Sequence, residues 1–130
     1  MRYLVDTHVW LWMHTEPERI RDEAAQVIVD AFDRLVLSAV SSWEIAIKYS
    51  IGRLPLPESP EHYVPIRIRS SGIGNLPITH SHTLRVVGLP PHHHDPFDRL
   101  LIAQAQVESL TIITADVVLA RYDVPILLAA

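Results

Sequence analysis

The sequence of 130 residues predicts an α/β domain in which helices cover a mostly parallel sheet. Short aliphatic runs alternate along the chain with segments that have the apolar spacing of a helix, and this alternation is typical of the fold class. Apolar residues make up 48% of the sequence and charged residues 20%, which is the balance of a folded protein with a buried core. The chain has no repeat and no low-complexity linker, so we expect residues 1–130 to form a single domain.

The first part of the chain predicts two strands and two helical segments. YLV at 3–5 is a short apolar run that predicts a buried strand, and the bulky run HVWLWM at 8–13 predicts a helical turn packed on the core. Residues 16–33 have apolar side chains at helical spacing and an acidic outer face, so they predict one amphipathic helix. LVLS at 35–38 predicts the second strand.

Apolar spacing and turn residues define the elements in the rest of the chain. SSWEIAIKYSIG at 41–52 predicts a helix that ends at Gly52, because glycine is preferred just past a helix C-terminus. A short helix is expected at 60–71, after an irregular proline-rich connection. The same reasoning predicts, in order, a strand at 76–79, a helix at 81–87, a long helix at 95–109, a strand at 111–114, a helix at 116–122 and a strand at 124–128.

Composition excludes several classes of site. The sequence contains no cysteine, which excludes disulfides, thiolate zinc sites and cysteine nucleophiles. The formal net charge is −4, so a nucleic-acid partner would have to meet local positive charge or bound cations. No apolar run approaches the roughly 20 residues that span a bilayer, and the N-terminus does not have the apolar region of a signal peptide. We therefore expect a cytoplasmic protein that does not bind membranes.

Four acidic residues fall at the points where predicted strands lead into helices: Asp6, Glu44, Asp98 and Asp116. If the sheet is parallel, these junctions share one edge, where such folds bind ligands, and the four carboxylates can converge. Carboxylates packed together repel one another unless a cation neutralises them, and oxygen-only ligands suit Mg²⁺ or Mn²⁺. Such a site is suited to the hydrolysis of phosphodiesters.

Each of these acids also has a structural interpretation. The stretch S-x-x-E that ends at Glu44 matches a capping box at a helix start. Asp95, followed by proline and by Asp98 at the third helical position, matches an N-cap sequence, and Asp116 is also placed to cap a helix. Asp6 is the hardest to explain in this way, because a carboxylate in the apolar context YLVDTHVW is costly to desolvate without a partner or a cation.

Four stretches of this chain, in this order, resemble the PIN-domain ribonucleases, and within them the VapC-type toxins of bacterial toxin–antitoxin pairs. They are YLVDTHVWLW, LSAVSSWEIAIK, DPFDRLLIAQA and TIITAD, and together they span nearly the whole chain. The resemblance implies a three-layer α/β/α sandwich and a metal-dependent RNA cleavage site formed by Asp6, Glu44, Asp98 and Asp116. It also implies a homodimer and inhibition by a small antitoxin protein.

The expected chemistry is hydrolysis of RNA with Mg²⁺, or Mn²⁺, held by these four acids. Water activated by the cation would attack the phosphorus and leave 5′-phosphate and 3′-hydroxyl ends, since no side chain is placed to activate a ribose hydroxyl. Thr7 and Thr114 flank the acids and are expected to orient them, although both also suit element ends. Asp95 is expected to cap a helix rather than to bind the cation.

The positive charge needed to bind RNA has to be local. Lys48 and Arg99 lie close in sequence to the acids and are candidate RNA contacts, although a solvated surface cation is the alternative for each. The histidines at 92–94 are consecutive, so they cannot all face one ion, and we expect them to lie in a solvent-facing loop. Contact of these histidines with RNA phosphates remains open. Trp43 is expected in the core.

Other functions are less compatible with the sequence. A phosphoryl-accepting signalling domain needs a lysine after a late strand, and the second half of the chain contains none. The motifs of a serine hydrolase, G-x-S-x-G, and of a P-loop are both absent. Two alternatives remain open: a PIN-like nuclease that acts in RNA maturation or on DNA, and a non-catalytic PIN-like binding module.

Overall fold

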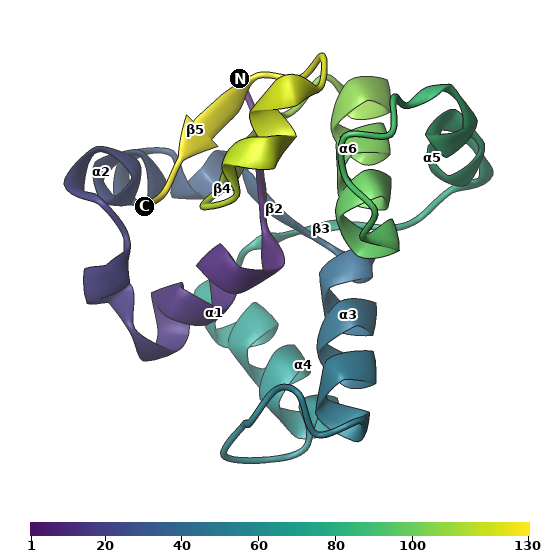
Figure 1. Ribbon diagram of the computed structural model, residues 1–130. Helices are drawn as coiled ribbons and strands as arrows, with labels where there is room; N and C mark the ends of the chain where they lie inside the picture. Colours follow the sequence, from purple (N-terminus) through teal and green to yellow (C-terminus); the bar gives the residue numbers. More distant parts are fainter.

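The computed structural model describes residues 1–130 and contains a five-stranded parallel sheet with helices on both faces (Figure 1). The strand order is β3-β2-β1-β4-β5, and each neighbouring pair is parallel. The strands are β1 (Tyr3–Val5), β2 (Leu35–Ser38), β3 (Gly74–Leu76), β4 (Thr111–Thr114) and β5 (Ile126–Leu128). The N-terminal strand thus lies in the centre of the sheet, which confirms the predicted α/β sandwich with a parallel sheet.

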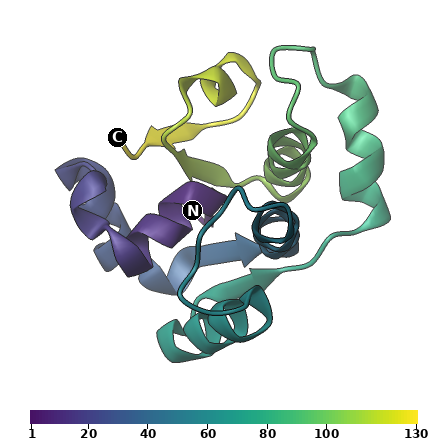
Figure 2. The same ribbon diagram turned by 60° about the horizontal axis from the view of Figure 1, so that its bottom comes forward.

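Six α-helices and four short 3₁₀ helices connect the strands. The α-helices are α1 (Thr7–Thr15), α2 (Asp22–Asp30), α3 (Ala39–Ser50), α4 (Pro60–Ser71), α5 (His80–Arg85) and α6 (Pro96–Glu108). The 3₁₀ helices are η1 (Pro17–Arg19), η2 (Phe32–Arg34), η3 (Val86–Gly88) and η4 (Val117–Arg121). Figure 2 shows α3 and α6 end-on, and these two helices also contact each other. No helix has both the length and the apolar character that crossing a membrane requires.

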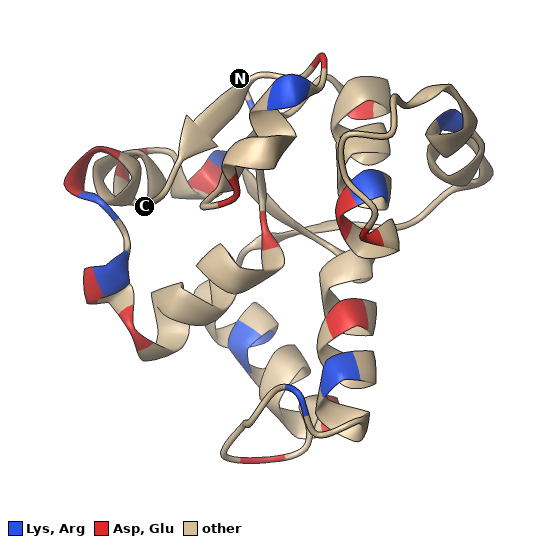
Figure 3. Cartoon of the chain, in the orientation of Figure 1, with Lys and Arg blue, Asp and Glu red and all other residues tan.

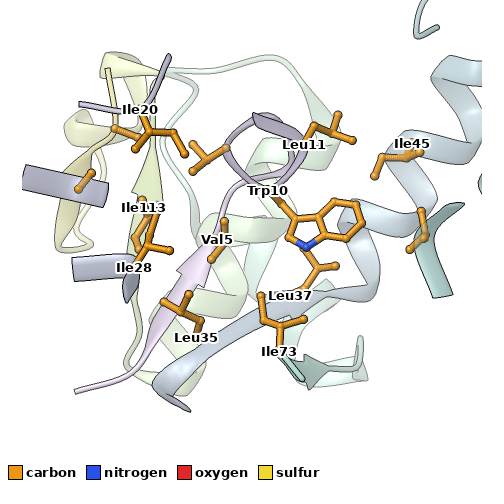
Figure 4. Packing of buried hydrophobic residues seen from close by; sticks show 14 of the residues in the cluster. Val5, Trp10, Leu11, Ile20, Ile28, Leu35, Leu37, Ile45, Ile73 and Ile113 are labelled. Atoms are coloured by element: carbon orange, nitrogen blue, oxygen red, sulfur yellow. The ribbon is translucent and has the colours of Figure 1, made fainter. Parts of the chain in front are cut away.

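Alternating side chains of the strands form two core layers on opposite faces of the sheet. Val5, Leu35 and Ile113 point to the face that α1, α2 and α4 cover, and Trp10 of α1 is the largest side chain buried there (Figure 4). On the other face, the strand residue Leu4 packs with residues of α6. Because a helix layer covers each face, the central strands β1, β2 and β4 are largely buried on both sides, as parallel strands usually are, while the edge strands β3 and β5 are more exposed.

Some element boundaries differ from the prediction. The segment 16–33 is not one helix, because Ile20 and Arg21 have extended backbone and separate η1 from α2. The third strand ends at Leu76 instead of reaching residue 79, and the next residue is a proline, which cannot donate a ladder hydrogen bond. The segment 116–122 forms a 3₁₀ helix instead of an α-helix.

The buried side chain of Gln104 ties α6 to β2 and α5. It accepts a hydrogen bond from Ser38 Oγ at 2.5 Å, and its amide lies 3.2 Å from His82 Nδ1 and 3.3 Å from the carbonyl of Pro77. His82 in turn contacts Glu108 at 2.8 Å. This chain of bonds fixes Ser38, the residue that caps α3.

We expect Gln104→Ala to lower the free energy of unfolding by about 2–4 kcal/mol, because it leaves buried polar partners without hydrogen bonds. Urea denaturation measures the change. The matched control is Gln26→Ala on the exposed face of α2, for which we expect a change within about 0.5 kcal/mol. Equal effects of the two substitutions would show that the network does not stabilise the fold.

Candidate active site

Asp6 is held at the carboxyl end of the central strand. It follows β1 and caps α1, and its Oδ1 accepts a hydrogen bond from the backbone N–H of Thr7 at 2.7 Å. Its Oδ2 accepts a bond from the hydroxyl of Thr114, at the end of the neighbouring strand β4, at 2.6 Å. Burial raises the pKa of Asp6 above its usual value, although the bond from Thr114 acts in the opposite direction. A carboxylate is therefore fixed where two central strands end.

Asp95 and Asp98 begin α6. Asp95 is the N-cap, and its Oδ1 accepts hydrogen bonds from the backbone N–H groups of Phe97 at 2.8 Å and of Asp98 at 3.3 Å. This arrangement is the helix start that the D-P-F-D sequence predicts. It uses the side chain of Asp95 in the cap and leaves the carboxylate of Asp98 free to face the other acids.

Asp98 lies close enough to the other three predicted acids to feel their negative charge. Burial, followed by the negative charges of Asp6, Asp95, Glu44 and Asp116, raises the pKa of Asp98 to about 8. These charges can act on Asp98 only because the segments that carry them lie around it. The structure therefore brings together the acids that the sequence placed at separate junctions.

Glu44 reaches this cluster from the second turn of α3 instead of from the predicted capping box. The helix begins at Ala39, and its N-cap is Ser38, whose Oγ accepts a bond from the backbone N–H of Val40 at 3.0 Å. Ser41 is inside the helix, and its hydroxyl accepts a bond from the Thr7 hydroxyl at 2.8 Å. The capping-box interpretation of Glu44 is therefore wrong. A role in starting the helix does not explain why a glutamate occupies this position.

Glu44 is buried, with 2% of its surface exposed, and only one of its two carboxylate oxygens has a hydrogen-bond partner. Lys48, one turn further along α3, donates a hydrogen bond to Oε2. The other oxygen, Oε1, has no hydrogen-bond partner. Burial alone would lower the pKa of Lys48, but its bond to Glu44 and the acids nearby raise it. A buried carboxylate oxygen without a partner is costly unless a donor or cation satisfies it.

Asp116 caps η4 and also contacts a histidine. Its Oδ1 accepts a bond from the backbone N–H of Val118 at 2.9 Å, which confirms the capping interpretation. Its Oδ2 lies 2.9 Å from Nε2 of His93, and the same Nε2 lies 3.1 Å from Oδ2 of Asp98. His92 and His94 are in the loop, as predicted, but the prediction of a solvent-facing side chain is wrong for His93.

Arg99 supports the loop that leads to α6. Its guanidinium donates to the backbone carbonyls of Val86, Leu89, Pro90 and His93 and to the hydroxyl of Tyr122, at 2.9–3.4 Å. These bonds give Arg99 a structural role, and the contact with RNA stays a prediction. They also fix the backbone that carries His93.

Trp43 is not a core residue. Its side chain is 49% exposed, and it packs edge to face on Phe97 with the ring centres 4.8 Å apart. The position beside Glu44 on α3 explains this exposure, because Glu44 faces inward and adjacent residues on a helix point about 100° apart. The prediction that Trp43 is buried is wrong.

The composition of the cluster fits a divalent cation. Acidic segments lie at the end of β1, on α3 and at the start of α6 (Figure 3). One atom each of His93, Asp98 and Asp116 lie within 4.8 Å of one another, which is a spacing that can accommodate an ion. The Oε1 of Glu44 has no partner and is open to a cation, and burial together with the nearby negative charges raises the pKa of Asp98. Oxygen donors of this kind suit hard cations such as Mg²⁺ and Mn²⁺.

Comparison with known protein families agrees with this arrangement. The PIN domain family matches residues 3–125. This protein belongs to the PIN-domain family. The match includes the strands β1 to β4 and ends one residue before β5, so the PIN domain accounts for most of the sheet. The resemblance that the four sequence stretches indicated is thereby confirmed.

Two curated relatives of this PIN-domain protein come from Mycobacterium tuberculosis. Ribonuclease VapC22 is 34% identical over 122 residues, which cover 87% of this chain and 85% of the relative. Ribonuclease VapC16 is 41% identical over 73 residues, but that match spans only 54% of this chain and about half, 52%, of the relative. Of these two relatives, only VapC22 is similar to this chain over most of its length.

Solved structures with the same fold include toxin–antitoxin complexes. VapBC2 from Rickettsia felis, bound to a DNA fragment from its promoter, has a TM-score of 0.75 at 13% identity and full coverage of both chains. DNA-bound VapBC from Salmonella typhimurium has a TM-score of 0.70 at 12% identity, covering 98% of this chain and 97% of that one. At such low identity these likenesses establish the fold.

Proposed function

We propose that this PIN-domain protein is a metal-dependent endoribonuclease, active in the cytoplasm as the toxin of a toxin–antitoxin pair. The observation that supports this most directly is that Asp98 is buried among other acids, and this burial and their negative charges raise its pKa to about 8. The 34% identity to ribonuclease VapC22 over 122 residues supports RNA as the substrate.

In this proposal Asp6, Asp98 and Asp116 hold the cation, and Glu44 completes the site with its unpartnered oxygen. The bound cation supplies a water of lowered pKa and stabilises negative charge on the phosphate. Thr114 and the Thr7 backbone amide fix both oxygens of Asp6, which keeps that carboxylate aimed at the site before substrate arrives.

Lys48 has two roles in the proposal. Its hydrogen bond to Oε2 orients the Glu44 carboxylate and leaves Oε1 free for the cation. Its side chain is also 28% exposed at the edge of the acidic cluster, so it can contact a substrate phosphate. Such a contact would position RNA without selecting its sequence.

The proposed partners are a cognate small antitoxin and a second copy of the chain. Relatives of the same fold were solved as VapBC assemblies, which supports an antitoxin partner. A groove of about 420 Å³ between α3 and α4 offers an apolar surface for a helix of the antitoxin. The residues that line it include Ala46, Pro60, Val64, Pro65 and Ile68.

Cleavage of RNA by the purified protein tests the proposal. We expect cleavage with Mg²⁺ or Mn²⁺, none with EDTA, and a loss of at least about 100-fold in Asp6→Asn, since even partners that only support metal ligands are worth 10–100-fold. The control is Asp33→Asn, a surface residue whose side chain is 85% exposed. Activity that survives both EDTA and the Asp6 substitution would rule out a metal nuclease.

The same assay separates the alternatives. Cleavage of single-stranded DNA at a rate equal to that of RNA would favour a nuclease of broader specificity, and binding of RNA without cleavage would favour a non-catalytic module. Growth arrest on expression, relieved by co-expression of a small protein encoded beside this one, is the result expected of a toxin.

A further inference from the structure

His93 lies between two of the acids that the proposed function assigns to the cation. Its Nε2 is 2.9 Å from Oδ2 of Asp116 and 3.1 Å from Oδ2 of Asp98, and its side chain is 19% exposed. The acids lie at the starts of α6 and η4, two elements that the chain separates by a strand. One imidazole nitrogen therefore contacts an oxygen of each of the two acids.

The other ring nitrogen of His93 determines which nitrogen carries the proton. Nδ1 accepts a hydrogen bond from the backbone N–H of Asp95 at 3.1 Å. A nitrogen that accepts this bond has no hydrogen, so in a neutral imidazole the hydrogen is on Nε2. Nε2 therefore acts as a donor toward Asp98 and Asp116.

This tautomer argues against His93 as a ligand of the cation. A ring nitrogen that carries hydrogen has no lone pair to offer a metal, and metal-binding histidines usually donate their other N–H to an acceptor. Here the group that faces Nδ1 is itself a donor, the amide of Asp95.

The backbone holds the ring of His93 in this place. Its N–H donates to the hydroxyl of Tyr122 at 2.7 Å, and its carbonyl accepts a bond from Arg99 at 3.4 Å. Tyr122 is itself buried, with 4% of its surface exposed. These backbone bonds place His93, rather than His92 or His94, between the two acids.

We propose that His93 is a positioning residue, whose Nε2–H holds Oδ2 of Asp98 and Oδ2 of Asp116 at the spacing that the cation requires without itself binding the cation. The inference rests on the proposed function, because it takes these acids as metal ligands. The Nε2–H suits this task, since one donor contacts an oxygen of each acid and so fixes the distance between them.

Binding of Mn²⁺ in the absence of RNA tests this role. Mn²⁺ titrated into the protein and followed by electron paramagnetic resonance gives the affinity directly. We expect His93→Ala to weaken binding by about 10–100-fold, the range for groups that support metal ligands. His93→Gln keeps an N–H donor at similar reach and should retain most of the affinity, and the control His94→Ala should match the wild type.

Three results would overturn the role of His93. The first is equal Mn²⁺ affinity of the wild type and of His93→Ala, and the second is equal loss in the Ala and Gln variants. The third is a strong nitrogen coupling to bound Mn²⁺ that disappears in His93→Ala, because this would identify His93 as a ligand. If the wild type bound no Mn²⁺, the metal-dependent function would fail as well, so the two failures are distinguishable.

Discussion

Asp98→Asn is expected to abolish RNA cleavage and, in the absence of metal, to make the protein more stable than the wild type. Cleavage is lost because the amide cannot supply the negative charge that holds the cation, and we expect a decrease of at least about 100-fold. Stability rises because the substitution removes a carboxylate whose pKa is raised to about 8 by burial and neighbouring charges. Each unit of such a shift is worth about 1.4 kcal/mol, so we expect a gain of at least about 2 kcal/mol at pH 8.

Two measurements on one variant check this prediction. Cleavage is measured with Mg²⁺, and the free energy of unfolding is measured with EDTA, so that metal binding does not contribute to stability. Asp33→Asn removes a charge from the exposed surface and should leave both quantities unchanged. A variant that is inactive but also less stable than the wild type would indicate that Asp98 serves the fold.

The metal-free wild type is expected to lose stability as the pH rises from about 4 to about 8. Asp98 has a folded-state pKa of about 8, against 3.8 for its ordinary value. Between these values the folded state holds a proton that the unfolded state has released, so the free energy of unfolding falls by up to about 1.4 kcal/mol per pH unit. Below pH 4 both states are protonated and the penalty is absent. The raised pKa of Asp6 acts in the same direction.

Thermal unfolding between pH 4 and pH 9 measures this dependence. With EDTA, the midpoint should fall with pH in the wild type and should fall less in Asp98→Asn. With saturating Mg²⁺, the wild-type midpoint should recover most at high pH, because the cation binds the ionised carboxylates. A midpoint that rises from pH 4 to pH 8 in EDTA would contradict the mutual repulsion on which the site depends.

The central part of the fold could be predicted because its signals are local. The strands at 3–5, 35–38 and 111–114 are aliphatic runs with a clear end, and the structure confirms all three. The extended pair Ile20–Arg21 was not predictable in this way. The apolar spacing continues through it, while the bond from the backbone N–H of Arg21 to the carbonyl of Ala129 is made across more than 100 residues.

The acids of the site were predictable for the same reason, since parallel strands bring their carboxyl ends to one edge. The role of Glu44 was obscured by a sequence that also matches a capping box, and only the observed helix start at Ala39 decides between the two interpretations. Whether these acids act in catalysis remains a prediction.

His93 was missed because three identical residues gave no reason to separate one from the others. What distinguishes it is the bond from its backbone to Tyr122, a residue 29 positions further along the chain. One local signal did exist, because His93 lies two residues before the N-cap Asp95, at a distance where a side chain can reach the cap amide. Trp43 shows the opposite case, in which a large aromatic residue suggested burial and the helix orientation exposes it.

The contact between Asp6 and Thr114 spans 108 positions of the chain. Translation proceeds from the N-terminus, so the first acid emerges from the ribosome long before the strand that orients it. A partly synthesised chain therefore lacks the assembled cluster, and β1 lacks its neighbour β4. The proposed RNA-cleaving site therefore cannot assemble before β4 has left the ribosome, and we expect a nascent chain that stops short of Thr114 to be inactive.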